Sequence, residues 1–240
     1  MENKHEILLG LTTTPSSDWR GKVEEMKKFG IKKIALFPTF LKIEERKELY
    51  KLLEDIEDLE IPHVHLRNDM DSNEIEYFKN RFKSQVFNIH PANNKYSFSD
   101  DFLKYSSQTY VENLIMIPTD EELRKYAGLC IDFSHWENNV RLNNNDWNNS
   151  SAKYNDVMID RLKGYLVGCC HVSAVLNEVR TGTDFPEGRQ YDSHTFNELD
   201  ELDYIGQYRQ YLPYYISLEL ENSFEEQLKA KQYLEGIINN

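Results

Sequence analysis

Eight short apolar, β-branched runs recur along the chain, and amphipathic charged stretches separate most of them. The runs are Ile7–Leu11, Ile31–Phe37, Ile61–Leu66, Val86–His90, Thr109–Glu112, Leu129–Asp132, Gly168–Val172 and Tyr215–Leu220. Each run has the length of a buried strand, whereas Trp19–Phe29 and Ile43–Leu59 carry apolar residues at helical spacing. This alternation predicts parallel strands joined by helical crossovers.

Helix-end signals fit the same alternation. Thr119 with Glu122, and Ser223 with Glu226, have capping-box spacing, which predicts helix starts just after the fifth and eighth strands. Gly30 is predicted to end the first helix. Eight strand-helix units in 240 residues, without a glycine-rich dinucleotide turn after the first strand, favour a closed (β/α)₈ TIM barrel over an open doubly wound sheet. We expect a single domain over residues 1–240.

The charge balance limits the partners of such a barrel. The chain has 28 Lys and Arg against 41 Asp and Glu, a net charge of −13, which disfavours a broad phosphate-gripping surface and docking on membranes. The sequence contains no apolar run of membrane-spanning length and no signal peptide, so we expect a cytoplasmic protein. Its three cysteines, two of them adjacent, are expected to be reduced thiols.

Six consecutive strand candidates carry, at or directly before their last residue, a side chain that can ligate a metal. These residues are His65, His90, Glu112, Asp132, His171 and Glu219. The carboxyl ends of barrel strands meet at one mouth, so the six side chains are expected to converge there. His135, Asp192 and His194 fit the same mouth and could bind a separate ion. Imidazole and carboxylate without thiolate suit Zn²⁺, Mn²⁺ or Fe²⁺. We expect two or three divalent ions, with Zn²⁺ preferred, and an anionic, phosphorylated substrate.

Each candidate also has a purely structural interpretation. A lone histidine at a strand end is usually a hydrogen-bonded structural residue, and only the convergence of the whole set favours metal binding. His63 shares a face with His65 but lies one layer deeper, which suits a core or supporting histidine. Glu221 competes with Glu219 for the place after the eighth strand. Cys169 and Cys170 resemble small buried hydrophobic residues more than metal ligands.

Two long stretches, Glu137–Ser151 and Leu176–Phe196, are expected to be irregular loops beside the mouth. The first is either a flexible surface loop or a substrate lid, and only Trp136 and Trp147 favour the lid. Trp136 and Arg67 are the candidate substrate-binding residues.

The ligand pattern resembles that of the xylose isomerase-like TIM barrels, a superfamily that includes endonuclease IV and sugar phosphate isomerases and epimerases. The resemblance is strongest to endonuclease IV and covers nearly the whole chain. The matching residues are His65, His90-Pro91, Glu112-Asn113, Asp132-Phe-Ser-His135, His171, Asp192-Ser-His194 and Glu219. The resemblance implies that Glu112 bridges two ions. It implies a first ion on His65 and His90, a second on Asp132, His171 and Glu219, and a third on His135, Asp192 and His194.

The resemblance also implies hydrolysis of a phosphate ester, with Glu112 and Glu219 at the reacting centre. The loops Pro38–Lys42 and Arg67–Met70 lack the basic and aromatic residues with which the nucleases enter DNA. A small sugar or nucleotide phosphodiester therefore suits the chain better than DNA with abasic sites, which remains a narrower alternative. A second class is a single-metal sugar or sugar-phosphate isomerase or epimerase, in which Glu112 and Glu219 move a proton. A third is a catalytically silent metal-binding barrel.

Overall fold

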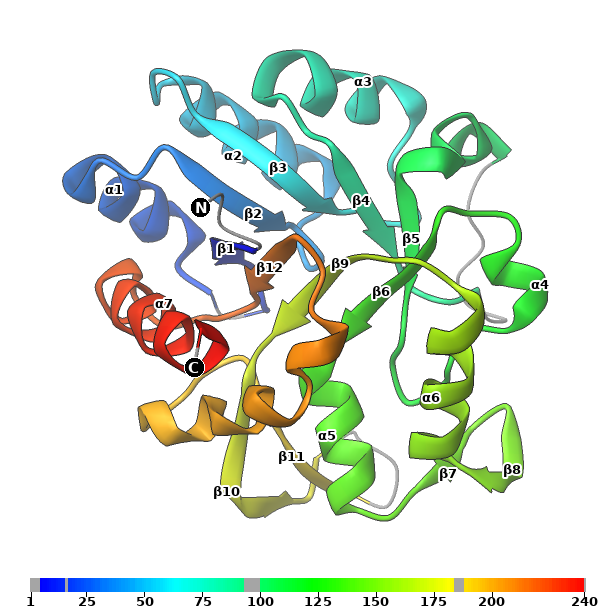
Figure 1. Ribbon diagram of the computed structural model, residues 1–240. Coiled ribbons are helices and arrows are strands. Elements are labelled where there is room, and N and C mark those ends of the chain that lie inside the picture. The colour runs from blue at the N-terminus through cyan, green and yellow to red at the C-terminus, as the bar shows by residue number, and fades with distance from the viewer. Residues whose placement is uncertain (1–4, 16, 93–99, 184–187, 240) are drawn as a thin grey trace.

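A computed structural model describes residues 5–15, 17–92, 100–183 and 188–239 (Figure 1). Eight parallel strands form a closed barrel in the order β1-β12-β9-β6-β5-β4-β3-β2. The barrel strands are β1 (Glu6–Thr12), β2 (Lys33–Phe37), β3 (Glu60–His65), β4 (Val86–Ile89), β5 (Thr109–Glu112), β6 (Gly128–Asp132), β9 (Val167–Val172) and β12 (Tyr215–Leu218). The predicted (β/α)₈ fold and all eight strand candidates are confirmed. Two ends are corrected, because β4 and β12 stop one residue before His90 and Glu219.

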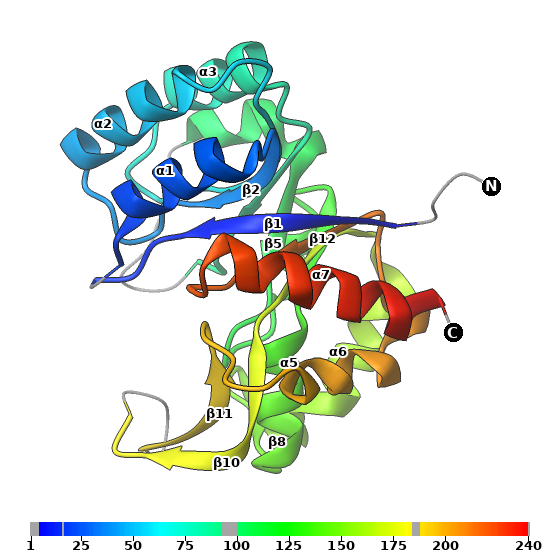
Figure 2. The ribbon, with the colours of Figure 1, turned by 90° about the vertical axis from the view of Figure 1, so that its left-hand side faces the viewer.

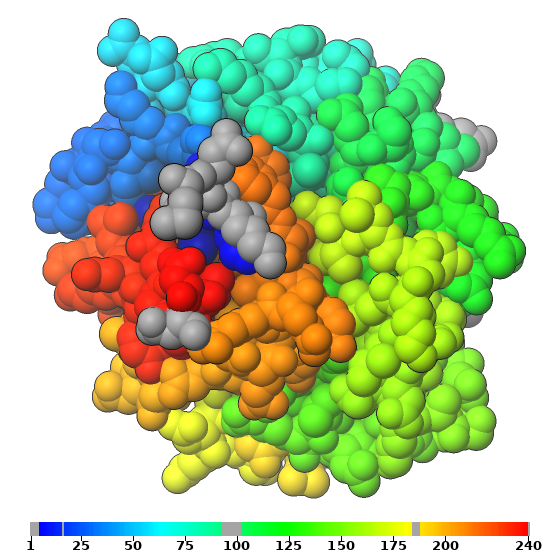
Figure 3. All heavy atoms as spheres, viewed as in Figure 1, coloured from blue at the N-terminus to red at the C-terminus, as the bar shows by residue number. Residues whose placement is uncertain are grey.

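The barrel closes between the first and last strands. Ile7 of β1 pairs with Ile216 of β12, and Figure 3 shows the orange and red end of the chain beside its blue beginning. Gly10 permits this approach, because a Cβ atom at that position would lie only 1.7 Å from the carbonyl oxygen of Leu218. Any other residue at Gly10 would have to push the two strands apart.

Helices surround the strands on the outside (Figures 1 and 2). The α-helices are α1 (Trp19–Phe29), α2 (Ile43–Glu54), α3 (Ser72–Phe82), α4 (Asp120–Leu123), α5 (Phe133–Arg141), α6 (Tyr154–Gly164) and α7 (Phe224–Asn239). The 3₁₀ segments are η1 (Asp100–Gln108), η3 (Leu199–Gln207) and η4 (Arg209–Tyr211). Most of the apolar core lies between these helices and the barrel.

The predicted helix signals are largely confirmed. Gly30, at a φ of 65°, ends α1 in the left-handed conformation that glycine adopts without strain. Both capping boxes form, with Thr119 and Glu122 at the start of α4 and Ser223 and Glu226 at the start of α7. The predicted extension of α2 to Leu59 is wrong, because the helix ends at Glu54.

The two stretches expected to be irregular contain secondary structure. Helix α5 continues to Arg141, and β7 (Asn145–Asp146) pairs with β8 (Asn149–Lys153). β10 (Ala174–Thr181) pairs with β11 (Arg189–Ser193) in an antiparallel hairpin that extends beyond the barrel (Figure 2). The prediction of loops was wrong here because these strands satisfy each other's backbone groups and need no continuous apolar face.

The inside of the barrel is divided into an apolar and a polar layer. The apolar layer contains Leu8, Ala35, Phe37, Tyr110, Cys130, Cys169 and Tyr215. All three cysteines are buried and free of disulfides. The polar layer lies at the carboxyl ends of the strands and holds the predicted ligands. Among the described residues, no helix is long and apolar enough to cross a membrane.

Candidate metal centre

Asp132 shows how the local sequence builds this centre. It is the last residue of β6 and the N-cap of α5, where its Oδ1 accepts the backbone N–H of His135 at 2.8 Å. The Oδ1 atom also accepts the hydroxyl of Ser134 at 2.6 Å. The Asp-x-x-His spacing is therefore that of an N-cap and the third helical residue. Capping occupies one carboxylate oxygen, while Oδ2 is buried without a hydrogen bond.

Three carboxylates surround one ring nitrogen of His171. Nδ1 lies 3.2 Å from Glu219 Oε2, 3.5 Å from Glu112 Oε2 and 3.9 Å from Asp132 Oδ2. The other nitrogen, Nε2, faces the thiol of Cys130 at 3.4 Å. With Nε2 directed to sulfur, Nδ1 is the atom of His171 that faces the centre.

His65 and His90 form a second group of possible ligands with Glu112. His65 donates from Nδ1 to the carbonyl oxygen of Leu66 at 3.0 Å, which leaves Nε2 directed to Glu112 Oε2 at 3.0 Å. The rings of His65 and His90 meet edge to face with centroids 4.5 Å apart. Glu112 Oε2 is thus near both His65 and His171.

Two groups of ligand atoms lie within 4.8 Å of one another in the combinations implied by the resemblance. They are His65 with His90 and Glu112, and Asp132 with His171 and Glu219. A third group joins Glu112, Asp132 and His135. The six predicted strand-end residues therefore do meet at one mouth, although they span more than 150 residues of sequence.

The implied third group assembles only in part. His135 Nδ1 lies 2.9 Å from Asp192 Oδ2 in β11, as the resemblance implies. Within the described part of the chain, no group of three ligand atoms within 4.8 Å includes Asp192 or His194. His194 is half-buried and close enough to Glu219 to lower the pKa of that carboxyl. Of the two glutamates that compete for the place after the eighth strand, Glu219 and Glu221, it is Glu219 whose carboxylate lies beside His171.

Several atoms of the centre are buried without any hydrogen-bond partner. They are His65 Nε2, Asp132 Oδ2, His135 Nδ1, His171 Nδ1 and Asp192 Oδ1. Some lie at salt-bridge distance from a carboxylate but outside hydrogen-bond geometry, as His65 Nε2 does from Glu112. Nitrogen and oxygen atoms that approach one another in this way need a proton or a cation between them. The donor set therefore fits divalent metal ions.

The electrostatics of these residues follow from burial and from their mutual contacts. Burial and the neighbouring His65 lower the pKa of His90 to about 4, so its ring is neutral and retains a lone pair near neutral pH. Against the effect of burial, Asp132 and Asp192 raise the pKa of His135 to about 10. Burial also opposes the pKa shift of Glu219, which His194 and His171 lower to about 2.

Two amides support the centre. Asn113 clamps the main chain of Asp132, accepting its N–H at 2.9 Å and donating to its carbonyl oxygen at 3.0 Å. Asn88 donates to Glu112 Oε2 at 2.6 Å. Asn88 was not predicted as a functional residue. Its signal was available, since it lies two residues before His90 and therefore on the same face of an apolar strand.

The predicted substrate residues have different surroundings. Trp136 is 1% exposed, stacks on Phe133 and packs against Tyr208 with ring centroids 4.7 Å apart. Its indole lies in the core, so the prediction that it contacts substrate or forms a lid is corrected. Trp147 is 62% exposed on the β7–β8 hairpin.

Arg67, in contrast, lines a cavity beside the centre. The cavity has a volume of about 370 Å³, and its walls include His65, His90, Arg67, Lys42 and Phe40. The guanidinium of Arg67 is held by Asp69 at 2.9 Å and by the carbonyl oxygen of Thr39. Two cationic side chains thus accompany the two histidines at this entrance.

Comparisons with known proteins add little to this geometry. No family model and no curated protein matches the chain. Among solved structures, the chain is similar to the crystal structure of a xylose isomerase domain protein from Planctomyces limnophilus. The two are 9% identical, the match covers 98% of this chain and 96% of the other, and the TM-score is 0.46.

Proposed function

We propose that the protein is a divalent-metal-dependent hydrolase of phosphate esters, acting on a small sugar or nucleotide phosphodiester. The observation that carries the proposal is the cluster of buried, unpartnered ligand atoms around Glu112, whose combinations match those of a multinuclear centre. His65, His90 and Glu112 would hold one ion, and Asp132, His171 and Glu219 a second. His135 and Asp192, with His194, would hold a third. Zn²⁺ suits this set best, with Mn²⁺ and Fe²⁺ as alternatives.

Bound divalent ions supply Lewis acidity that lowers the pKa of water and stabilises negative charge on phosphate oxygens. The protein's own side chains prepare that chemistry. Glu112 lies between the two ligand groups, and Asn88 fixes one of its oxygens. Lys42 at the neighbouring cavity provides positive charge where an anionic substrate enters, and Arg67 lies beside it with its charge shared with Asp69. Phe40, 53% exposed on the same wall, offers an apolar surface for a sugar or base ring.

DNA is a weaker candidate substrate than a small phosphodiester. Of the basic residues that might have gripped a DNA backbone, Arg46 is buried and paired with Glu74 at 2.9 Å. Arg141 is engaged by Glu137 at 2.8 Å. A surface that neutralises several phosphates needs a cluster of available cations.

The test is hydrolysis of a chromogenic phosphodiester by metal-free protein supplied in turn with Zn²⁺, Mn²⁺ and Fe²⁺. We expect metal-dependent turnover in the wild-type protein and in Cys170→Ala, and its loss in Glu112→Gln. Absence of turnover with all three metals would contradict the hydrolase. An abasic duplex in the same assay tests DNA.

One observation supports an isomerase or epimerase as the second candidate function. Asp132, His171 and Glu219 form a compact group that could serve a single ion by itself. One tightly bound equivalent of metal in the fully folded protein, with turnover of a sugar phosphate and none of the phosphodiester, would favour that reaction.

A further inference from the structure

A buried line of polar side chains runs from β12 across the barrel to Glu112. Ser217 Oγ lies 2.7 Å from His63 Nδ1, and His63 Nε2 lies 3.0 Å from Asn88 Oδ1. Asn88 Nδ2 donates to Glu112 Oε2 at 2.6 Å. Ser217, His63 and Asn88 have no exposed surface. Because water does not reach them, these groups must satisfy one another.

The direction of each hydrogen bond follows from the carboxylate at the end of the line. Glu112 accepts, so the amide nitrogen of Asn88 faces it and the amide oxygen faces His63. His63 Nε2 must therefore carry the proton. In the neutral ring Nδ1 then accepts from the hydroxyl of Ser217. All three protons are donated toward Glu112, and each bond polarises the next.

We propose that His63 is a positioning residue that holds Asn88, and through it Glu112, in the geometry needed to bind metal. The inference rests on the proposed function, since Glu112 matters here as the ligand that two ions would share. Side chains that orient metal ligands commonly change metal affinity without contacting the ion. Here the contact passes through two hydrogen bonds, from His63 to Asn88 and from Asn88 to Glu112. His63 also lies on β3, two residues before the proposed ligand His65.

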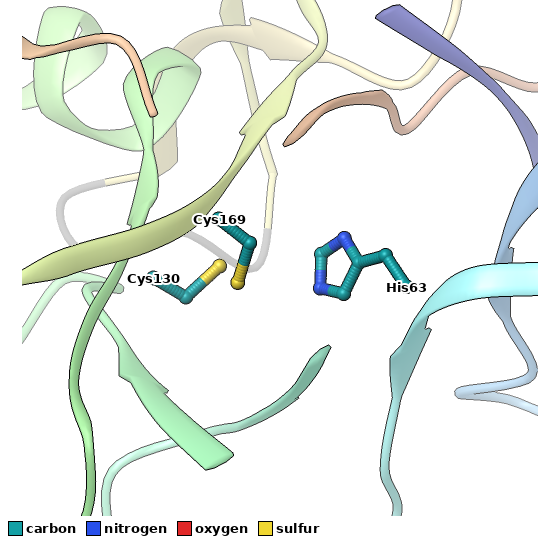
Figure 4. A group of neighbouring side chains, drawn as sticks. All are labelled: His63, Cys130 and Cys169. Carbon is teal, nitrogen blue, oxygen red and sulfur yellow. The ribbon is translucent and has the colours of Figure 1, made fainter. Parts of the chain in front are cut away.

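His63 could instead be a metal ligand together with two cysteines. With Cys130 and Cys169 it forms a group whose ligand atoms lie within 4.8 Å of one another, and Figure 4 shows its ring facing the two sulfur atoms. Both ring nitrogens, however, already have oxygen partners at hydrogen-bond distance, in Ser217 and Asn88. Turning Nε2 to an ion would leave the buried oxygen of Asn88 without a donor, which is costly. Both sulfurs also belong to the apolar layer of the barrel. The hydrogen-bonded line is therefore favoured over a thiolate site.

The experiment measures the dissociation constant for Co²⁺ by competition with a chelator, in the wild-type protein and variants along the line. We expect Asn88→Ala to weaken binding about 100-fold and His63→Leu about tenfold, the range found for groups that orient ligands. Ser217→Ala, one bond further away, should have a smaller effect. Cys170→Ala is the matched control, because Cys170 is equally buried but its thiol contacts the main-chain carbonyl oxygen of Tyr215 and packs in the outer apolar core, not in the line.

A merely structural role for His63 predicts a different outcome. The loss of Co²⁺ affinity in each variant would then parallel its fall in melting temperature. It would not depend on how close the substituted residue is to Glu112. In a Glu112→Gln background, the positioning role predicts that His63→Leu causes no further loss of Co²⁺ affinity. An equal loss in both backgrounds would overturn the inference.

The remaining outcomes separate the inference from the proposed function. Wild-type protein that binds no Co²⁺ contradicts the metal centre, and the inference falls with it. Wild-type protein that binds Co²⁺ while His63→Leu binds it equally well overturns the positioning role alone. Thiolate-to-cobalt absorption in the near ultraviolet that disappears in Cys169→Ala would assign an ion to the thiols and would also overturn it.

Discussion

The clamp between Asn113 and Asp132 makes a quantitative prediction about stability. Asn113→Ala removes the acceptor for the N–H of Asp132 at 2.9 Å, the donor to its carbonyl oxygen at 3.0 Å, and the contact with the Tyr154 hydroxyl at 3.1 Å. An unsatisfied buried polar group costs about 1–3 kcal/mol, and more than one is created here, so we expect a loss of about 3 kcal/mol. For a chain of this size that loss corresponds to a fall in Tm of roughly 6–12 °C.

Urea unfolding in the presence of a chelator measures this loss without a contribution from metal binding. The matched control is Asn145→Ala, because the exposed side chain of Asn145 donates one bond to Ser150 at 2.7 Å. A surface change of this kind should alter stability by less than about 0.5 kcal/mol. Similar losses for Asn113→Ala and Asn145→Ala would refute the argument that the clamp stabilises the strand end that carries Asp132.

Three further changes test other parts of the structure. Trp136→Ala should cost about 3–5 kcal/mol of unfolding free energy because it empties a buried aromatic cluster, and Trp147→Ala about 0.5 kcal/mol or less; equal losses in urea would contradict the burial of Trp136. Glu74→Gln leaves the buried Arg46 guanidinium without the carboxylate that binds it through two nitrogens, and should cost about 3–5 kcal/mol; a change near zero would show that the pair is not needed. In metal-free protein, the pKa of His135 is raised from 6.5 to about 10, so its stabilising contribution is complete below pH 6.5 and is lost as the pH rises through 10. The Tm of the wild-type protein should therefore fall more between pH 6.5 and 10 than that of His135→Gln, and parallel curves would refute this sign.

Much of the fold could be predicted because each barrel strand has a recognisable apolar pattern in its own stretch of sequence. The apolar runs are short and bounded by helix signals, and an inward-facing ligand is conspicuous when it directly follows such a run, as with Glu112 and Asp132. Closure of the barrel then follows from the number of strand-helix units. The convergence of six strand-end ligands required no knowledge of individual contacts.

What could not be predicted depends on partners that are distant in sequence. Trp136 sits in the first turn of a helix near the mouth, and only the later segment that carries Tyr208 shows that it is buried. Ser217 meets His63 across 154 residues, and neither residue type signals that contact. The β10–β11 hairpin was missed because its two strands pair with each other outside the barrel sheet, and most of their residues are not buried. In each case the burial or the contact depends on a segment that is distant in sequence, and the local pattern alone does not determine it.

The central claim, that side chains at the carboxyl end of the barrel hold divalent ions, is tested most directly by counting those ions. Elemental analysis of protein dialysed against Zn²⁺ and then against metal-free buffer should find two or three equivalents in the wild-type protein. Glu112→Gln, with an unchanged circular dichroism spectrum, should retain at least one equivalent fewer. Wild-type protein that keeps no zinc, or a variant that keeps as much as the wild type, would contradict the account.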